Sequence, residues 1–324
     1  MSYPTQRMRR LRRNPGIRRM VQESRLSVAD LIYPLFIVHG TGVKKEIEVL
    51  PGNYHLSLDR LEEEGRAIYD LGIPAVILFG LPARRDEMAT EAYDPNGIVQ
   101  QAMKLLKKSV PDLIVIGDVC LCEYTPHGHC GIIKDGYLQN DASVELLRKV
   151  TLSQAEAGAD IVAPAAMLDG QVAAMRSALD DRGFTEVAIM GYSAKMASKL
   201  YDPFFKSGTE SAVAFGDKKS HQMDYSNADE ALREIGLDIE EGADIVMVKP
   251  GMFYMDIIYR AKQKYGVPLA VYNVSGEYTM IKAAAQLGRI NDKEITLELL
   301  TSFKRAGADL IITYSAREIA PLLK

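Results

Sequence analysis

Three cysteines, the only ones in the chain, stand close together as Cys120, Cys122 and Cys130. An odd, tightly clustered set is a poor disulfide framework and is typical of thiolates kept reduced for a metal. Thiolates bind soft or borderline metals rather than magnesium, and three of them leave one position of a zinc ion open, as catalytic zinc requires. Two alternatives stay open: a closed structural site completed by His127 or His129, and three inert buried cysteines.

Two lysines stand where apolar segments end. Lys249 follows the apolar residues 246–248, and Lys195 closes the segment 190–195. A buried ammonium is costly unless it is neutralised or paired, and two neighbouring ammonium groups lower each other's pKa. A neutral lysine attacks ketones and forms a Schiff base. The alternative is that each lysine reaches solvent or pairs with Asp118 or Asp169.

A repeated phrase indicates how these residues are positioned. Gly-Ala-Asp followed by aliphatic residues begins at Gly158, Gly242 and Gly307. Each copy is typical of a helix that ends at glycine, where a left-handed backbone is cheap, followed by a buried parallel strand. Together with other short apolar runs, the pattern predicts strands at 31–38, 75–80, 113–119, 160–164, 187–193, 244–249, 269–275 and 309–314.

Helical patterns separate these strands, which predicts a parallel sheet with helices outside. Eight such units in one chain of 324 residues favour a closed (β/α)8 barrel over a doubly wound sheet, since no glycine-rich phosphate loop follows any strand. Barrel enzymes carry their chemistry at the carboxyl ends of the strands. The residues there are Asp118, Cys120, Asp169, Lys195, Lys249, Ser275 and Tyr314.

Composition fits an ordinary globular enzyme, with 47% hydrophobic and 25% charged residues and a net charge of −4. No apolar run approaches the roughly 18 residues of a membrane span, and no secretory signal is visible, so a cytoplasmic location is the expectation. We expect a basic arm at 1–25, followed by a single barrel domain at 26–324.

The arm contains many arginines and no acid before residue 21. It fits a segment that grips a neighbouring subunit, an organellar transit peptide or a nucleic-acid arm, and we favour the first. A second irregular segment, residues 201–227, lacks helical or strand periodicity. It is expected to be a lid that keeps water from an imine, with an ordinary surface loop as the alternative.

The combined motifs resemble the porphobilinogen synthase (5-aminolevulinate dehydratase) family along essentially the whole chain. The resemblance depends on residues 118–130, 192–195, 247–250, 273–278 and 305–309, and on the arginine-rich start. It implies a lyase that condenses two 5-aminolevulinate molecules to porphobilinogen, an early step of tetrapyrrole and haem biosynthesis.

The resemblance also implies roles for single residues. Lys249 would form a Schiff base with the propionate-side substrate, whose carboxylate Ser275 and Tyr314 would hold, and Lys195 would form one with the acetate-side substrate. The three cysteines would carry zinc, and Asp118 would assist proton transfer. Tyr192 and Asp169 are further expected substrate-binding residues. Glu234 matches a family position for an accessory magnesium, and the arm would wrap a neighbour in a homo-octamer. Neither nucleic acid nor a membrane is an expected partner.

The departures from the family pattern cluster on the acetate side. Phe205 and Lys218 stand where the family has arginines that hold the acetate-side carboxylate. Lysine is a weaker substitute for a bidentate clamp, and phenylalanine is none, although Lys206 could swing in. We therefore expect weakened acetate-side affinity or a different second substrate. A diverged paralogue with an altered pocket and a non-catalytic zinc-binding barrel are the alternative functions.

Overall fold

The computed structural model describes residues 5–323, so residues 1–4 of the expected arm and residue 324 lie outside it. It confirms the closed barrel. Eight parallel strands follow one another in the order of the chain, and the last pairs with the first through Leu31 and Ile311. The barrel strands are β1 (Leu31–Val38), β4 (Ala75–Leu81), β5 (Ile114–Val119), β8 (Ile161–Pro164), β9 (Ala188–Lys195), β10 (Ile245–Lys249), β11 (Leu269–Asn273) and β12 (Leu310–Thr313).

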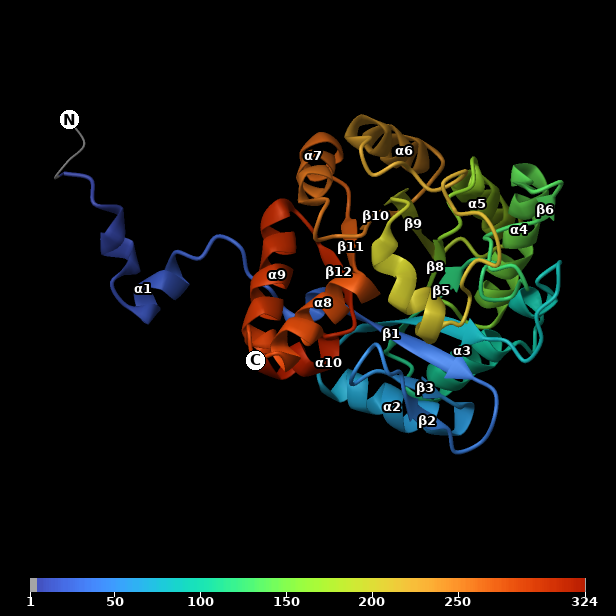
Figure 1. Cartoon of the computed structure of the whole chain (residues 1–324), viewed down its shortest axis with the longest axis horizontal. Coiled ribbons are helices and arrows are strands. Elements are labelled where there is room, and N and C mark those ends of the chain that lie inside the picture. The colour runs from blue at the N-terminus through green and yellow to red at the C-terminus, as the bar shows by residue number, and fades with distance from the viewer. Residues whose placement is uncertain (1–4, 324) are drawn as a thin grey trace.

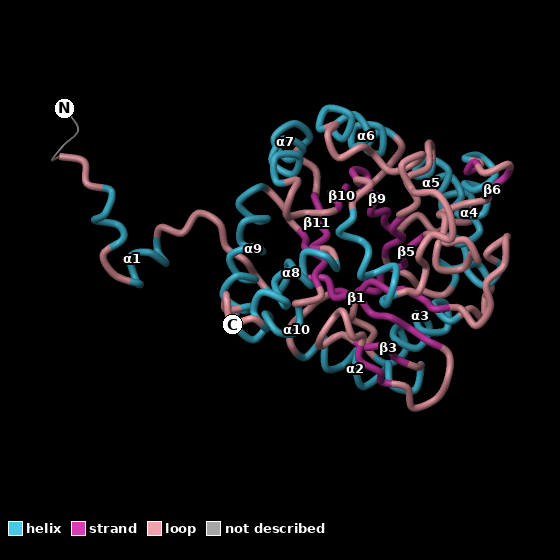
Figure 2. The backbone as a smooth tube through the Cα atoms, viewed as in Figure 1, coloured by secondary structure: helices cyan, strands magenta, loops and turns pink. Residues whose placement is uncertain are grey.

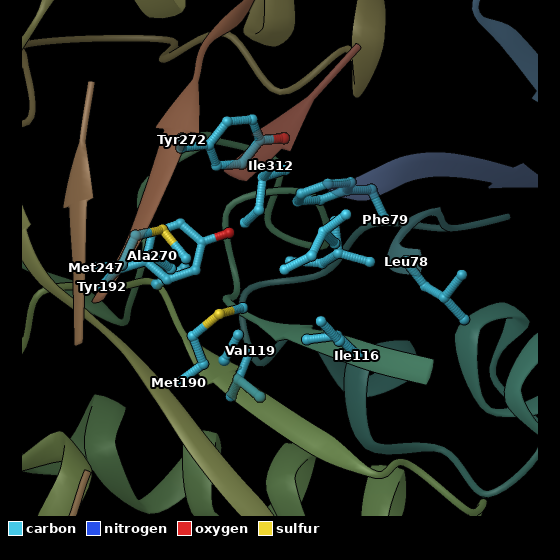
Figure 3. Close-up of a cluster of buried hydrophobic side chains, with 14 of the residues drawn as sticks. Leu78, Phe79, Ile116, Val119, Met190, Tyr192, Met247, Ala270, Tyr272 and Ile312 are labelled. Carbon is cyan, nitrogen blue, oxygen red and sulfur yellow. The ribbon is translucent and has the colours of Figure 1, made fainter. Parts of the chain in front are cut away.

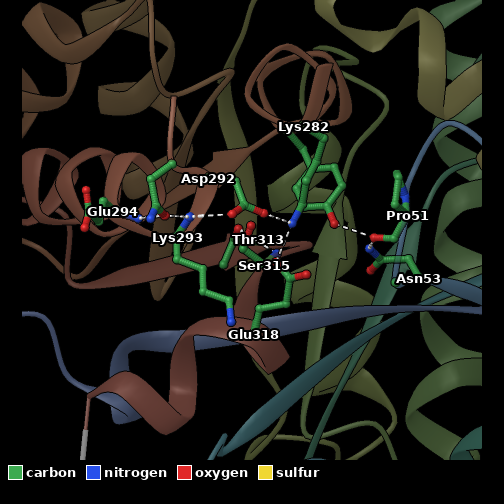
Figure 4. Close-up of polar contacts among 12 residues, drawn as sticks. Pro51, Asn53, Lys282, Asp292, Lys293, Glu294, Thr313, Ser315 and Glu318 are labelled. Atoms are coloured by element: carbon green, nitrogen blue, oxygen red, sulfur yellow. Dashed lines mark hydrogen bonds and ion pairs between the residues drawn. The ribbon is translucent and has the colours of Figure 1, made fainter. Parts of the chain in front are cut away.

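Helices surround the strands, as Figures 1 and 2 show. They are α2 (Leu58–Asp70), α3 (Ile98–Ser109), α4 (Asn140–Glu156), α5 (Gln171–Asp181), α6 (Ala228–Glu240), α7 (Met255–Tyr265), α8 (Ser275–Gln286), α9 (Asp292–Ala306) and α10 (Ala316–Ile319). A polar cluster ties the last three together, because Lys282 Nζ in α8 lies 2.8 Å from Asp292 at the start of α9 and 2.6 Å from Glu318 in α10 (Figure 4).

The repeated Gly-Ala-Asp phrase has a structural reason at the amino ends of the strands. Each aspartate accepts a hydrogen bond of 2.8 Å from a backbone N–H of the preceding barrel strand. The pairs are Asp160 with Val115, Asp244 with Ile189, and Asp309 with Leu269. The glycine of each phrase has a positive φ, between 98° and 118°. The phrase therefore turns the chain out of a helix and fastens the next strand to its neighbour.

Side chains from all sides of the barrel fill its interior (Figure 3). Ile116, Met190, Met247, Ala270 and Ile312 are completely buried there. Such a packed barrel is rigid and contains no pore, so the carboxyl ends of the strands form the floor of any site above it.

The remaining elements are not part of the barrel wall, and residues 199–208 among them lie over the barrel mouth, where Tyr201 and Phe204 approach Lys249. They are the short strands β2 (Lys44–Glu46), β3 (Tyr54–Leu56), β6 (Ile133–Lys134) and β7 (Tyr137–Leu138), the short helices η2 (Val28–Asp30), η3 (Thr90–Tyr93), η4 (Lys199–Tyr201), η5 (Phe204–Gly208) and η6 (Ala320–Leu322), and the arm elements η1 (Met8–Arg12) and α1 (Pro15–Met20). The two arm elements project away from the barrel (Figure 1) and contain no buried residue. No helix within residues 5–323 is long and apolar enough to cross a membrane.

Strand boundaries differ from the expected ones at three site residues. Strand β9 extends to Lys195, two residues beyond the expected end at residue 193. Strand β11 ends at Asn273, so Ser275 is the first residue of α8 rather than the last of a strand. Strand β12 ends at Thr313, and Tyr314 follows it directly. Ser275 and Tyr314 still stand at the carboxyl edge of the barrel, because the chain leaves each strand only one or two residues earlier.

Candidate active site

The two lysines occupy neighbouring positions at the barrel mouth. Lys195 ends β9 and Lys249 ends β10, and the two residues are direct partners across the pair of strands. Their exposed fractions are only 4% and 7%. The Nζ of Lys195 donates a hydrogen bond of 2.5 Å to the carbonyl oxygen of Ala165. Parallel strands therefore bring two primary amines together in a nearly dry environment.

Four aromatic rings surround the amine of Lys249. Its Nζ lies 4.2 Å from the ring centroid of Tyr272, 4.9 Å from Tyr192, 5.4 Å from Tyr201 and 5.5 Å from Phe204. Rings within about 6 Å attract a cation through their electron-rich faces. This aromatic cage excludes water and also favours a positive charge on the nitrogen. Of its members, only Tyr192 was an expected site residue.

Burial sets the protonation of this amine. Loss of solvation lowers the pKa of Lys249 to about 7, and the neighbouring charge of Lys195 lowers it as well, while the carboxylate of Asp118 acts in the opposite direction. Burial also raises the pKa of Asp118 to about 7, with a further contribution from Glu123. A substantial fraction of Lys249 is thus neutral near pH 7, as a nucleophilic amine must be.

The three cysteines converge beside the lysines. Their sulfur atoms all lie within 4.8 Å of one another, and the thiols of Cys120 and Cys122 are 3.3 Å apart. All three side chains are buried. Three converging soft donors fit a borderline metal such as zinc. Among the described residues 5–323, the three cysteines form a group whose candidate ligand atoms are close enough together to hold a metal ion. No histidine belongs to this group.

The two histidines of the cysteine loop have other partners. His129 Nε2 lies 3.0 Å from the carbonyl oxygen of Phe215, and His127 Nε2 lies 3.5 Å from Glu87. Each histidine thus has a polar partner other than a cysteine sulfur. The geometry supports a site of three thiolates with an open position over a closed site of four protein ligands.

One small cavity joins the amines to the thiols. Its lining includes Asp118, Cys120, Cys122, Lys195 and Lys249. A second small cavity borders Lys249 on its other side and is lined by Ser275, Tyr314 and members of the aromatic cage. The hydroxyl of Tyr314 lies 3.2 Å from that of Tyr272. The barrel mouth therefore contains two adjoining compartments that share Lys249.

Phe205 and Lys218, the two residues expected to replace arginines, also lie in this region. Phe205 lines both small cavities, and Lys218 Nζ lies 4.0 Å from the centre of its ring. The same nitrogen is 3.6 Å from the sulfur of Cys130. Burial alone would lower the pKa of Lys218, but the charges of Cys122 and Cys130 raise it, so this side chain stays cationic. Lys206 instead points outward to Asp202, at 3.7 Å, and does not replace an arginine in the pocket.

Asp169 and Glu234 lie apart from the lysines. Both line a separate polar cavity of about 550 Å³, together with Asp238. Burial raises the pKa of Glu234, with a contribution from Asp169. The backbone of Asp169 is fixed to the side chain of Asn140, at 2.9 and 3.1 Å. Asp169 is therefore not brought to either lysine compartment.

The fold and the site together define a (β/α)8-barrel enzyme with paired lysine amines next to a cluster of three thiols that could hold a metal ion. Comparison with known proteins identifies the family within this class. Residues 5–322 match the family profile described as delta-aminolevulinic acid dehydratase, and the chain belongs to that family.

Relatives of established name cover nearly the whole chain. The delta-aminolevulinic acid dehydratase of Synechococcus elongatus is 56% identical over 322 residues, which are 98% of each protein. That of Bacillus subtilis is 51% identical over 323 residues, covering 100% of this chain and 99% of the relative. The Toxoplasma gondii enzyme in complex with its product porphobilinogen superposes with a TM-score of 0.95 at 42% identity, over 98% of this chain and 91% of that one.

Proposed function

We infer that this protein is a lyase that condenses two 5-aminolevulinate molecules to porphobilinogen with loss of two waters. The named relatives support this reaction. The single observation that carries its chemistry is the placement of Lys195 and Lys249 as partners on adjacent strands, in one cavity with Cys120 and Cys122.

Lys249 is proposed to bind the propionate-side substrate. Its neutral amine attacks the ketone carbon, and the carbonyl oxygen leaves as water to give a Schiff base. Protonation makes this imine a cation, which the aromatic cage stabilises. The hydroxyls of Ser275 and Tyr314, in the compartment next to Lys249, are proposed to hold the substrate carboxylate.

Lys195 is proposed to bind the acetate-side substrate in the compartment shared with the cysteines. Asp118 lines the same cavity, and its pKa near 7 suits a group that both accepts and releases protons. Cys120, Cys122 and Cys130 would hold zinc. When bound, zinc supplies a Lewis acid that polarises an oxygen or nitrogen of this second substrate.

Three further features belong to the proposal: a lid, an assembly arm and a second metal site. The segment 201–227 would act as a lid, because the ring of Phe204 lies 5.5 Å from the amine of Lys249 and Phe205 lines both cavities beside it. The basic arm would grip a neighbouring copy in a homo-octamer, since its described helices leave Met8 and Met20 exposed. Glu234 would hold an accessory magnesium in the outer cavity.

Metal removal tests the function directly. Purified protein supplied with 5-aminolevulinate is expected to form a coloured pyrrole adduct in the colorimetric assay, and a chelator is expected to abolish it. Zinc should restore at least about half of the original rate, whereas magnesium should not, because thiolates prefer the softer ion. Full activity after exhaustive chelation, with no residual metal by elemental analysis, would contradict the proposed zinc role.

The Lys249 amine also predicts a pH dependence. Its pKa is lowered to about 7, so the amine is protonated and unreactive below pH 7 and becomes nucleophilic above it. Levulinate carries the same ketone and carboxylate without an amine, so it isolates the Lys249 step. Its trapping by cyanoborohydride, followed by mass spectrometry, should rise with pH through a midpoint near 7. A midpoint near the ordinary lysine value of about 10 would refute the perturbed amine.

A diverged paralogue is the second candidate, favoured by Phe205 and Lys218 at the acetate side. Such an enzyme would keep the Lys249 Schiff base but join a different amine or ketone to it. Product analysis with 5-aminolevulinate as the sole substrate separates the two functions, because the paralogue would give no porphobilinogen.

A further inference from the structure

A buried carboxylate lies behind the propionate-side compartment. Glu277 in α8 is fully buried, and its oxygen atoms accept three hydrogen bonds from neutral amides. Oε1 accepts from the backbone N–H of Met252 at 2.6 Å. Oε2 accepts from the side-chain amide of Asn273 at 2.8 Å and from the backbone N–H of Val274 at 3.1 Å. This one side chain therefore joins the loop after β10 to the end of β11.

The network continues to the next strand. The other side-chain atom of Asn273, Oδ1, accepts a hydrogen bond of 2.8 Å from the hydroxyl of Thr313. That hydroxyl accepts one of 3.2 Å from the backbone N–H of Ser315. All these side chains have exposed fractions of 2% or less. The hydrogen bonds thus link the carboxyl ends of β10, β11 and β12 through side chains that are shielded from solvent.

Each contact falls beside a residue assigned to the substrate. Met252 follows Lys249 by three residues, and Val274 directly precedes Ser275. Thr313 and Ser315 stand on either side of Tyr314, close to the polar cluster of α8 to α10 (Figure 4). None of the network atoms belongs to the Schiff-base lysine or to the two hydroxyl groups themselves.

We propose that Glu277 is a positioning residue, which fixes the nucleophile Lys249 relative to the carboxylate anchors Ser275 and Tyr314. The proposal rests on the proposed function of those three residues. A substrate of fixed length must place its ketone at the amine while its carboxylate reaches the hydroxyls, so the spacing between the three strand ends decides whether it reacts. A misplacement of about 1 Å can cost about 100-fold in rate.

The chemistry of the contacts argues against a mere packing role. Burial raises the pKa of Glu277 to about 7. The hydrogen bonds from Met252, Asn273 and Val274 act in the opposite direction, because they stabilise the ionised carboxylate and lower its pKa. A buried carboxylate is costly to maintain, and an apolar residue would fill the space more favourably. To join the strand ends, the side chain at this position must accept hydrogen bonds from N–H groups on both of its terminal atoms, as a carboxylate does. A glutamine here would turn an N–H group toward other N–H groups and lose part of the network.

Glu277→Gln tests the proposal, with Asp309→Asn as a matched control. Asp309 also accepts from a backbone N–H of β11 and from a side-chain nitrogen, Lys262 Nζ at 2.7 Å, but at the opposite end of the barrel. Both variants should lower the melting temperature. Only Glu277→Gln should lower kcat/KM for 5-aminolevulinate and the rate of levulinate trapping on Lys249, each by about 30- to 100-fold.

A second pair of variants covers the case in which Glu277→Gln does not fold. Thr313→Val removes the hydroxyl at nearly constant shape, and Thr313→Ser keeps it. We expect a loss of about tenfold in levulinate trapping for valine and recovery to within twofold of wild type for serine. Equal trapping by wild type and Thr313→Val overturns the proposal, as does a Glu277→Gln variant that is less stable but traps levulinate at the wild-type rate. Failure of the wild-type protein itself to form any adduct at Lys249 would instead reject the proposed function.

Discussion

Replacing Lys249 with methionine is expected to lower kcat/KM for 5-aminolevulinate by at least about 1,000-fold, because the side chain keeps its length and apolar stem but has no nucleophile. The buried position leaves little room for another group to substitute. Lys195 is the partner of Lys249 on the neighbouring strand, and the Nζ of Lys195 is already held by the carbonyl oxygen of Ala165. Steady-state kinetics by the pyrrole assay measures the change.

Loss of stability is not expected to explain such a result, since methionine fills the buried position with an apolar side chain and removes a polar group whose burial is costly. We therefore expect Lys249→Met to melt no lower than wild type. Lys262→Met is the matched control, because Lys262 lies in α7 and pairs with Asp309 outside the site. Its activity should stay within twofold of wild type. Retention of more than a tenth of the wild-type rate by Lys249→Met would contradict covalent catalysis at this residue.

Lys218 carries the second large effect. It is the cation at one of the two positions where the resemblance predicts arginines, and it lies between Phe205 and the thiol of Cys130. Removal of one partner from a buried charge pair costs about 2 to 5 kcal/mol, so Lys218→Met should raise KM by about 30-fold or more. Lys218→Arg should lower KM below the wild-type value, because a guanidinium binds a carboxylate through two parallel hydrogen bonds.

Metal content separates two explanations of the Lys218→Met result. If the variant keeps its zinc while KM rises, Lys218 acts on the substrate carboxylate. A loss of zinc with unchanged KM of the remaining active fraction would show that Lys218 serves the thiolates alone. Lys218→Arg combined with Phe205→Arg should lower KM further if the wild-type pocket is weakened. A double variant with unchanged KM would refute the weakened acetate side.

The fold could be predicted from the sequence because its signals are local. The Gly-Ala-Asp phrases mark helix ends and strand starts within a few residues, and the order of the chain is the order of the strands. Adjacent strands then imply that Lys195 and Lys249 are neighbours. The ends of β11 and β12 could not be predicted from the sequence, because the run of buried residues continues through Ser275 and Tyr314 after the strand hydrogen bonds stop.

Contacts between distant segments could not be predicted in the same way. Three members of the aromatic cage, Tyr201, Phe204 and Tyr272, come from the segment 201–227 and from a strand interior, and their ring directions depend on tertiary packing. Glu277 was missed for a different reason. A glutamate three residues after a helix N-cap is typical of an ordinary capping interaction, which hides its additional contacts with Met252 and Asn273.

The central claim is that a buried amine of this barrel forms a covalent imine with the substrate. Incubation with 5-aminolevulinate, reduction with borohydride, digestion and peptide mass spectrometry test it most directly. The account predicts a reduced adduct on the peptide that contains Lys249, at a stoichiometry approaching one per chain, and its absence without borohydride. An adduct only on lysines outside the two compartments, or no adduct in protein that is turning over substrate, would contradict it.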